Sequence, residues 1–294
     1  MVCPRINSFC ERHTGLYSLI NASRTLPLAE PAEMSKEENA ASLKPECTTP
    51  VDGSCCDRRI VLLGRTGSGK SSAANTILGR SAFWVETSAC SVTSKCRKQS
   101  GQVNKWNTSV VDTPGFFHTT MSLQEVIDEM GQCIKLYSPG PHVFILTLQI
   151  CKFTQEEKDC LDWIKAIFGS GVLKYTLLLF TCGDQLHGKH IEDYVAESVE
   201  LSEFVSGCHG GYHVFDNSNI PTVSSEQVID LMEKIDKMVA ENEDVYYTRE
   251  MFEGAEMALT EIQKRMTSES VCPLSPQKAR NGHTLQGEDV KKTA

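Results

Sequence analysis

Residues 59–71, RIVLLGRTGSGKS, decide the fold of this chain. Arg59 to Leu63 are typical of a short buried strand, and residues 72–78 have the composition of a helix. Between them lies the pattern G-x-x-x-x-G-K-[ST], in the strand–loop–helix setting that phosphate binding requires. The stretch therefore predicts a phosphate-binding loop, and the alternative is a Gly/Ser-rich turn that happens to carry a lysine.

Each part of this loop has an expected task. The glycines let the backbone curl so that successive N–H groups face a phosphate, and the start of the helix adds its positive end. Lys70 is expected to reach the β- and γ-phosphates, and the hydroxyl of Ser71 is expected to hold Mg²⁺. The predicted nucleotide-binding residues here are Gly64, Arg65, Thr66, Gly67, Ser68, Gly69, Lys70, Ser71 and Ser72.

A second motif, Asp112-Thr-Pro-Gly115, follows a strand predicted at 106–111. An aspartate at the tip of a buried strand can bind Mg²⁺ through water, and the N–H of Gly115 can sense a γ-phosphate. The same four residues also suit a turn, so the alternative role for Asp112 is to start one. Two such motifs in this order are more specific than either alone.

Thr93 is the best candidate for a switch residue between the two motifs. Residues 83–91 are predicted to form a polar loop, and residues 92–98 alternate like an edge strand. A threonine here could close its hydroxyl and carbonyl over Mg²⁺ and the γ-phosphate, and Thr87 and Ser91 are its rivals. Because a threonine in an edge strand needs no functional reason, a plain strand residue is the alternative.

Strands and helices alternate along the rest of the chain. Strands are predicted at 142–150, 174–181 and 212–215, and helices at 122–137, 154–169, 190–207, 222–238 and 246–266. This order predicts an α/β fold of the P-loop NTPase type, with a mainly parallel sheet, helices on both faces and a C-terminal helical extension. The nucleotide is expected at the carboxyl ends of the strands.

Residues 181–186, TCGDQL, leave a predicted strand where guanine-specific NTPases carry an aspartate. A carboxylate there can accept N1–H and the exocyclic N2–H₂ of guanine, whereas adenine offers no such donor pair. Asp184 is therefore the predicted guanine reader, with Thr181 and Cys182 beside it, and a loop or N-cap aspartate is the alternative. Asn217 follows the last strand, where it could contact the base or form part of a turn.

Composition and charge narrow the classes of function. The chain has 294 residues, 40% hydrophobic and 23% charged, which suits one large globular domain with extensions, or at most two domains. A net charge of −9 argues against nucleic acid as a partner. No run reaches the roughly 18 apolar residues of a membrane helix, and no secretory signal is evident. Thirteen cysteines without a C-x-x-C pair indicate reduced thiols and a cytoplasmic setting.

Six motifs in order make the chain similar to the AIG-type domain of the GTPases of immunity-associated proteins, the GIMAP family. This family resembles septins and chloroplast Toc GTPases, and the similarity covers roughly residues 58–266. The motifs are the loop at 64–71, Ser91-Val-Thr93, Asp112-Thr-Pro-Gly115, the box at 153–157, the loop at 180–186 and Phe215-Asp-Asn217.

The resemblance implies a protein that binds GTP or GDP with Mg²⁺ and forms a homodimer or oligomer through its nucleotide face. It implies that Thr93 is the switch threonine, that Asp184 reads guanine and that Asn217 contacts the base. The residues predicted to hold Mg²⁺ are Ser71, Thr93 and Asp112.

Three departures from the family bear on activity. Val85 stands where a small polar residue usually lies near the nucleotide. Lys152 stands where a hydrolysing member carries an arginine that acts across a dimer, and lysine lacks the planar fork. Phe116 stands where Ras-like enzymes place a water-orienting glutamine, so slow or partner-dependent hydrolysis is expected. The candidate catalytic residues are Lys70, Thr93 and Lys152.

The chain is expected to divide into a flexible leader at 1–57, an AIG-type G domain at 58–242, a helical extension at 243–267 and a disordered tail at 268–294. An apolar stripe predicts that the extension packs against the core, and a partner groove is the alternative. The stripe consists of Met251, Phe252, Met257, Leu259 and Ile262.

The first functional hypothesis is a switch in which GTP orders the residues around Thr93 and Gly115 and creates a surface that pairs with a second copy. The second is a nucleotide-bound scaffold with negligible turnover, which Lys152 and the missing glutamine favour. The third is an ATPase, in which Asp184 would have no part in base selection. No transmembrane anchor is expected, and peripheral association with a membrane stays open.

Overall fold

A computed structural model gives the arrangement of most of the chain. It describes residues 56–85, 93–115, 123–137, 139–151, 153–216 and 226–269. Residues 1–55 and 270–294 lie outside this description, and so do the predicted residues Thr87, Ser91, Phe116, Lys152 and Asn217.

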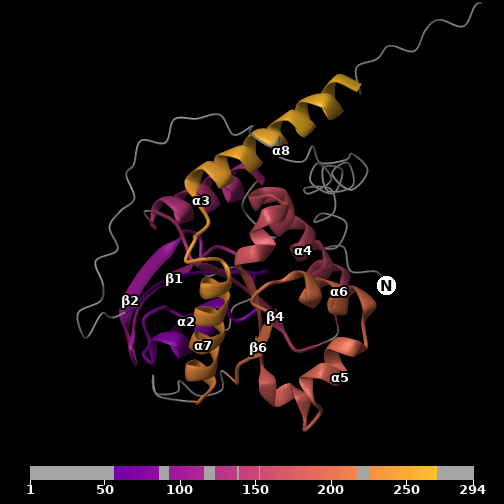
Figure 1. Ribbon diagram of the computed structural model, residues 1–294. Helices are drawn as coiled ribbons and strands as arrows, with labels where there is room; N and C mark the ends of the chain where they lie inside the picture. The colour runs from indigo at the N-terminus through magenta and orange to yellow at the C-terminus, as the bar shows by residue number, and fades with distance from the viewer. Residues whose placement is uncertain are drawn as a thin grey trace, which may run out of the picture.

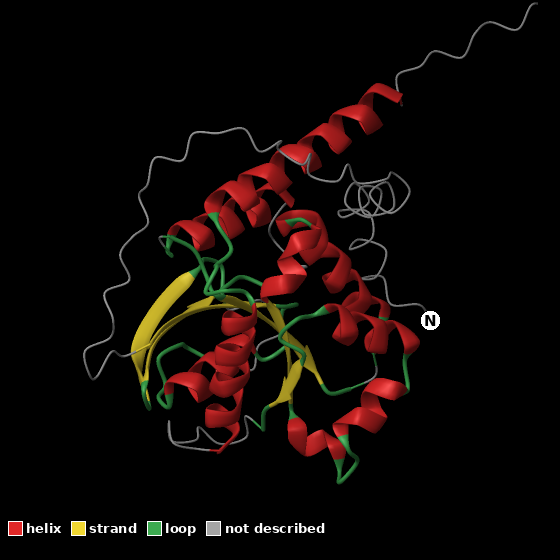
Figure 2. Ribbon diagram, viewed as in Figure 1, coloured by secondary structure: helices red, strands yellow, loops and turns green. Residues whose placement is uncertain are grey.

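A sheet forms the middle layer of the fold (Figure 2). Its strands are β1 Cys56–Leu63, β2 Arg97–Val103, β3 Trp106–Asp112, β4 Val143–Gln149, β5 Thr176–Thr181 and β6 Tyr212–Val214. Within the described residues their order is β2-β3-β1-β4-β5-β6, with β2 antiparallel at one edge and the others parallel. This confirms the predicted α/β fold with a mainly parallel sheet.

Helices cover both faces of the sheet, as predicted (Figure 1). The α-helices are α2 Lys70–Leu78, α3 Leu123–Lys135, α4 Gln155–Phe168, α5 Ile191–Ala196, α6 Val199–Gly207, α7 Glu226–Glu241 and α8 Arg249–Glu269. Two 3₁₀ helices, η1 Ser170–Tyr175 and η2 Gly183–Leu186, flank β5.

Successive residues of β1 pack against opposite layers of helices. Ile60 and Leu62 lie in the core with α2 and α7, whereas Val61 and Leu63 lie in the core with α3, α4, α6 and α8. The pleat of a strand turns consecutive side chains to opposite faces. Because both faces are covered, the central strands are nearly continuous apolar runs rather than alternating ones.

The edge strand β2 lies further along the chain than the sequence predicts. The prediction is a strand at 92–98, whereas β2 spans Arg97–Val103 and residues 93–96 precede it. The reason is a tight turn in which Asn104 has a φ of 50° and Val103 pairs with Trp106, which fixes the register of the hairpin. The predicted extent was therefore wrong, and Thr93 lies in the loop before the strand.

Residues 190–207 form two helices, α5 and α6, where the sequence predicts one. Ser198 lies between them with an extended backbone, and its hydroxyl accepts a hydrogen bond from the N–H of Leu201 at 3.3 Å. Serine is a strong N-cap, so it begins a new helix here. The prediction of a single helix was wrong for this reason.

The last helix, α8, packs against α3 and α4 and shares their core. Phe252 and Leu259 are buried, as predicted for the apolar stripe. The prediction was wrong for Met251 and Met257, which are 43% and 73% exposed. The side chain of Ile262 lies outside the description. Neither α8 nor another described helix is long and apolar enough to cross a membrane.

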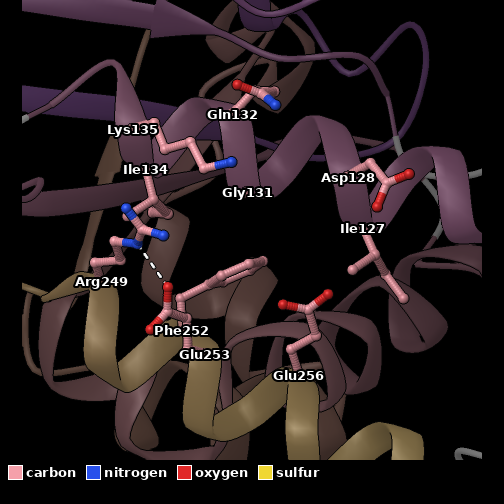
Figure 3. Close-up of a pocket in the computed structure, with 10 residues that line it drawn as sticks. All are labelled: Ile127, Asp128, Gly131, Gln132, Ile134, Lys135, Arg249, Phe252, Glu253 and Glu256. Atoms are coloured by element: carbon pink, nitrogen blue, oxygen red, sulfur yellow. Dashed lines mark hydrogen bonds and ion pairs between the residues drawn. The ribbon is translucent and has the colours of Figure 1, made fainter.

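A cavity of about 350 Å³ lies between α3 and α8 (Figure 3). Phe252 points from α8 toward Gly131 of α3, where an added Cβ would lie 3.2 Å from the ring atom Cε1. Arg249 and Glu253 form an ion pair of 2.6 Å along the wall of the cavity. A side chain at position 131 would therefore require the ring of Phe252 to shift slightly.

Tyr247 anchors the segment that leads into α8. Its ring is 1% exposed and packs on Phe144 of β4, with 5.1 Å between ring centroids. Its hydroxyl donates a hydrogen bond of 2.8 Å to the carbonyl oxygen of Phe168, the last residue of α4. Tyr247 therefore joins the last helix to both the sheet and α4.

Truncation of Tyr247 is expected to lower stability in two steps. Tyr247→Phe leaves the carbonyl of Phe168 without its donor and should cost about 1 kcal/mol of unfolding free energy. Tyr247→Ala also opens a cavity beside Phe144 and should cost about 3–5 kcal/mol. Urea titration measures both, and Met257→Ala is an exposed control expected to change stability by at most about 0.5 kcal/mol. Equal losses for Tyr247→Ala and Met257→Ala would contradict this role.

Candidate functional site

The loop between β1 and α2 has a backbone that requires glycine. Gly64, Gly67 and Gly69 have φ values of 145°, 82° and 90°, which residues with a side chain rarely adopt. An added Cβ at Gly64 would also lie 2.5 Å from the hydroxyl oxygen of Thr147. Gly69 is the N-cap of α2, so the loop leads directly into the start of the helix. This is the curled backbone that the sequence predicts.

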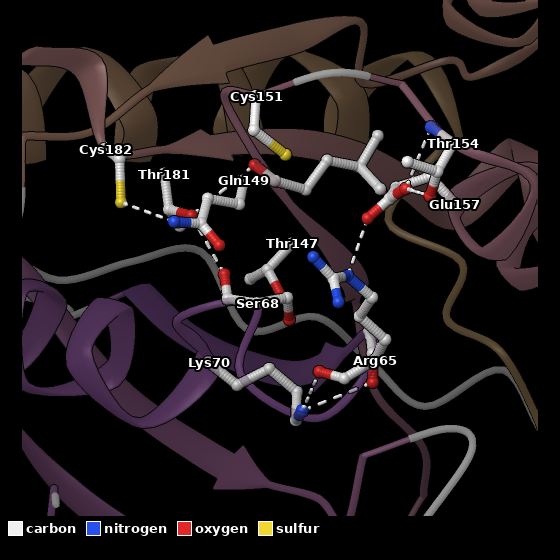
Figure 4. A network of polar contacts seen from close by, with 12 residues as sticks. Arg65, Ser68, Lys70, Thr147, Gln149, Cys151, Thr154, Glu157, Thr181 and Cys182 are labelled. Carbon is white, nitrogen blue, oxygen red and sulfur yellow. Dashed lines mark hydrogen bonds and ion pairs between the residues drawn. The ribbon is translucent and has the colours of Figure 1, made fainter. Parts of the chain in front are cut away.

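Two threonines from neighbouring strands contact Ser68 of the loop (Figure 4). The hydroxyls of Ser68 and Thr147 lie 2.6 Å apart, and Thr147 also donates to the carbonyl oxygen of Leu63 at 3.1 Å. The hydroxyl of Thr181 donates to the carbonyl oxygen of Ser68 at 2.9 Å. Sequence reasoning missed Thr147, although a lone threonine within the apolar run of β4 was a usable signal.

Lys70 is buried inside the loop. Its Nζ donates to the carbonyl oxygens of Gly64 and Arg65, at 3.2 and 2.9 Å. Burial lowers the pKa of this ammonium to about 8, and the charge of Asp112 acts in the opposite direction. A bound polyanion would add negative charge beside this buried ammonium.

The three residues predicted to hold Mg²⁺ meet at one carboxylate. Oδ2 of Asp112 accepts hydrogen bonds from Ser71 Oγ at 2.6 Å and from Thr93 Oγ1 at 3.3 Å. Burial raises the pKa of Asp112, and within the described residues its buried Oδ1 has no hydrogen-bond partner. Hydroxyl and carboxylate oxygens are the hard ligands that Mg²⁺ prefers, so this donor set fits the ion.

Gly115 lies directly against the phosphate-binding loop. An added Cβ there would lie 2.4 Å from both the backbone N and the hydroxyl oxygen of Thr66. No other residue fits without moving the loop, so the Asp112–Gly115 motif and the first loop form one surface. The geometry favours a site residue at Gly115 over a simple turn.

The residues predicted to read the base follow β5. Cys182 has a φ of 60°, its Sγ lies 3.5 Å from the Gln149 amide nitrogen, and the N–H of Gly183 donates to the carbonyl oxygen of Phe215 at 2.9 Å. Asp184 is exposed in η2, and its Oδ2 accepts a hydrogen bond of 2.6 Å from Gln185. The TCGDQL loop therefore presents Asp184 to solvent beside the end of β6.

Two further cavities adjoin each other at Phe83, Trp84 and Arg97. One of about 320 Å³ is also lined by Thr93 and Asp112. The other, of about 680 Å³, extends to the predicted residues Ser72 and Val85. Val85 is 51% exposed, so it lies at the mouth of this space rather than in the core.

Glu157 is a neighbour of the loop that sequence reasoning did not assign to the site. Glu157 follows Thr154 by three residues, which is the spacing of a capping box, and the structure has that box with Thr154 as the N-cap of α4. Its Oε1 also lies 2.6 Å from Nε of Arg65 in the loop. The capping signal is local, and it gives no indication of a partner in the loop that follows β1.

Comparisons with known proteins agree with this geometry. A family model described as the AIG1 family matches residues 58–266, more than half of the chain. The chain is 34% identical over 201 residues to immune-associated nucleotide-binding protein 9 of Arabidopsis thaliana, covering 66% of this chain and 59% of that protein. It is 28% identical over 198 residues to GTPase IMAP family member 8 of Homo sapiens, covering 67% of this chain and 30% of that protein. The chain thus spans less than two thirds of either relative.

Among solved structures, the fold is similar to that of Toc33 from Arabidopsis thaliana, solved as a dimerization-deficient mutant. The TM-score is 0.50 at 14% sequence identity, covering 63% of this chain and 85% of that chain. At this identity the likeness concerns the fold alone. It supports the α/β architecture of the chain.

Removal of the Ser71 hydroxyl is expected to weaken Mg²⁺-dependent binding of GDP. Ser71→Ala removes one of the oxygens that meet at Asp112, so the gain in affinity from Mg²⁺ should fall about tenfold or more. Calorimetric titration with GDP, in Mg²⁺ and in EDTA, measures this gain. Ser100→Ala, on the exposed edge strand, is the control. An unchanged Mg²⁺ effect in Ser71→Ala would remove this residue from the metal site.

Proposed function

This chain belongs to the AIG1 family, and on that premise we propose that it is a guanine-nucleotide-binding switch. It binds GTP or GDP with Mg²⁺ and, in the GTP form, pairs with a second copy through its nucleotide face. The observation that carries the proposal is the meeting of Ser71 and Thr93 on the buried carboxylate of Asp112, beside a loop that encloses Lys70.

The residues of the loop divide the recognition of the triphosphate. Lys70 exchanges its bonds to the loop carbonyls for the β- and γ-phosphate oxygens, which restores a counter-charge to a buried ammonium. Ser71, Thr93 and Asp112 hold Mg²⁺, which supplies positive charge to the phosphate oxygens when bound. Gly115 lies close enough to the loop for its N–H to distinguish GTP from GDP.

Asp184 selects the base in this proposal. Its carboxylate accepts the two N–H groups on one edge of guanine, and adenine offers no matching pair. The exposed position after β5 supports this role, with Thr181 and Cys182 at the base of the same loop. Asn217 is proposed as a second base contact, although it lies outside the described residues.

Assembly would bring the segment around Lys152 of one copy to the nucleotide of the other. Dimerization is a property ascribed to Toc33, and we extend it to this chain as part of the proposal. A lysine there supplies charge without the planar fork of arginine, so GTP turnover is slow and depends on pairing. The alternative is a nucleotide-bound scaffold with negligible turnover.

Base selection by Asp184 predicts a change of specificity on Asp184→Asn. The amide cannot accept both N–H groups of guanine but can donate to the extra carbonyl of xanthine. GTP affinity should therefore fall by about 10–100-fold while affinity for xanthosine triphosphate rises. Competition against a fluorescent GTP analogue measures both, with Asp193→Asn as the exposed control. Equal displacement of the analogue by ATP and GTP from the native chain would refute guanine selection.

Turnover that depends on pairing should rise with protein concentration. Phosphate release per chain under saturating GTP is expected to increase with protein concentration, since the second copy completes the site. Lys152→Arg should make phosphate release rise more steeply with protein concentration, because it restores a planar guanidinium group. Flat, near-zero release at all concentrations for both proteins would favour the scaffold.

A further inference from the structure

The ion pair between Arg65 and Glu157 connects the phosphate-binding loop to the first turn of α4. Arg65 Nε lies 2.6 Å from Glu157 Oε1. The side chain of Glu157 is 2% exposed and that of Arg65 is 27% exposed, so the contact is shielded from water. Figure 4 shows Arg65 reaching out of the loop toward Glu157, which comes from a different part of the chain.

The two oxygens of Glu157 have separate partners. Oε2 accepts hydrogen bonds from the hydroxyl of Thr154 and from its backbone N–H, the latter at 3.0 Å. The bond from the backbone N–H is the contact that the Glu157 side chain makes in the capping box. Oε1 faces Arg65 instead. A capping box needs only the first set of contacts and usually lies at a helix surface. The second contact therefore has no explanation in the formation of the helix.

Arg65 is held at both its ends. Its carbonyl oxygen accepts a hydrogen bond of 2.9 Å from Nζ of Lys70, and its guanidinium pairs with Glu157. A continuous set of contacts thus runs from the ammonium of Lys70 through Arg65 to Glu157 in the first turn of α4.

We propose that Glu157 is a positioning residue of the nucleotide site, which holds the loop in its binding shape through Arg65. The proposal rests on the proposed function, since it concerns the nucleotide that the loop binds. A carboxylate this buried requires its cation, so Glu157 fixes where the Arg65 side chain, and with it the loop backbone, can lie. By linkage, a nucleotide that depends on this loop shape leaves faster when the pair is broken.

The test is the rate at which a fluorescent GDP analogue dissociates from the full chain in Mg²⁺. Arg65→Gln, Glu157→Gln and the double variant are compared with the native chain. Each single change should raise the rate about fivefold or more, and the double variant should not exceed the larger single effect. Arg65→Lys keeps the charge without the fork and should fall between native and Arg65→Gln.

Thr154→Ala is the matched control, because it removes the hydroxyl from the capping contact and leaves the Arg65–Glu157 pair. It should lower the melting temperature while its dissociation rate stays within about twofold of native. If Glu157→Gln does not fold, the test rests on the dissociation rates of the two Arg65 variants, which should increase from native through Arg65→Lys to Arg65→Gln.

Three results would overturn the inference, and each is distinguishable from a failure of the proposed function. Native rates in both Arg65 variants, or effects that multiply in the double variant, would show that the pair does not position the loop. A rate for Thr154→Ala as high as for Glu157→Gln would assign the effect to helix capping alone. Absence of GDP binding by the native chain would instead refute the proposed function itself, and the inference with it.

Discussion

The candidate site depends on the hydrogen bonds that two buried threonines make to Ser68. Thr147 comes from β4 and Thr181 from β5, and both lie under the loop that follows β1. An unpaired hydroxyl in such a dry position is unfavourable, so the loop has one favourable position on the sheet. Lys70 and Ser71 begin the helix that follows this loop, so the position of the loop determines where they lie. The parallel order of the strands is what brings these threonines to the same edge.

Much of the site could be predicted from the sequence because its signals are local. The glycines and Lys70 of the first loop, and Asp112 with Gly115, are defined by short patterns whose mechanisms require a strand end. The convergence of Ser71, Thr93 and Asp112 in space agrees with those patterns. Alternation of apolar strands and amphipathic helices was likewise sufficient for the fold class.

Contacts between distant segments carry no such signal. Nothing near Glu157 in the sequence indicates that it pairs with Arg65, because the capping box already accounts for its presence. The extent of β2 depended on the turn at Asn104 rather than on apolar alternation. In α8, helical spacing placed Met257 with Phe252, but only packing against α3 decides which of them is buried. The spacing of apolar residues shows which face of a helix is buried. How much of that face is buried depends on the element that packs against it.

The two edge strands of the described sheet, β2 and β6, affect how readily the protein aggregates through strand pairing. On one side, β2 exposes Arg97 and Lys98, and the ammonium of Lys98 donates to the carbonyl oxygen of Leu136 at 3.1 Å. On the other, β6 has only 3 residues. Charged or very short outer strands are poor templates for a strand from another molecule. The described edges of the sheet are therefore poor templates for amyloid-like stacking or for strand pairing between two copies.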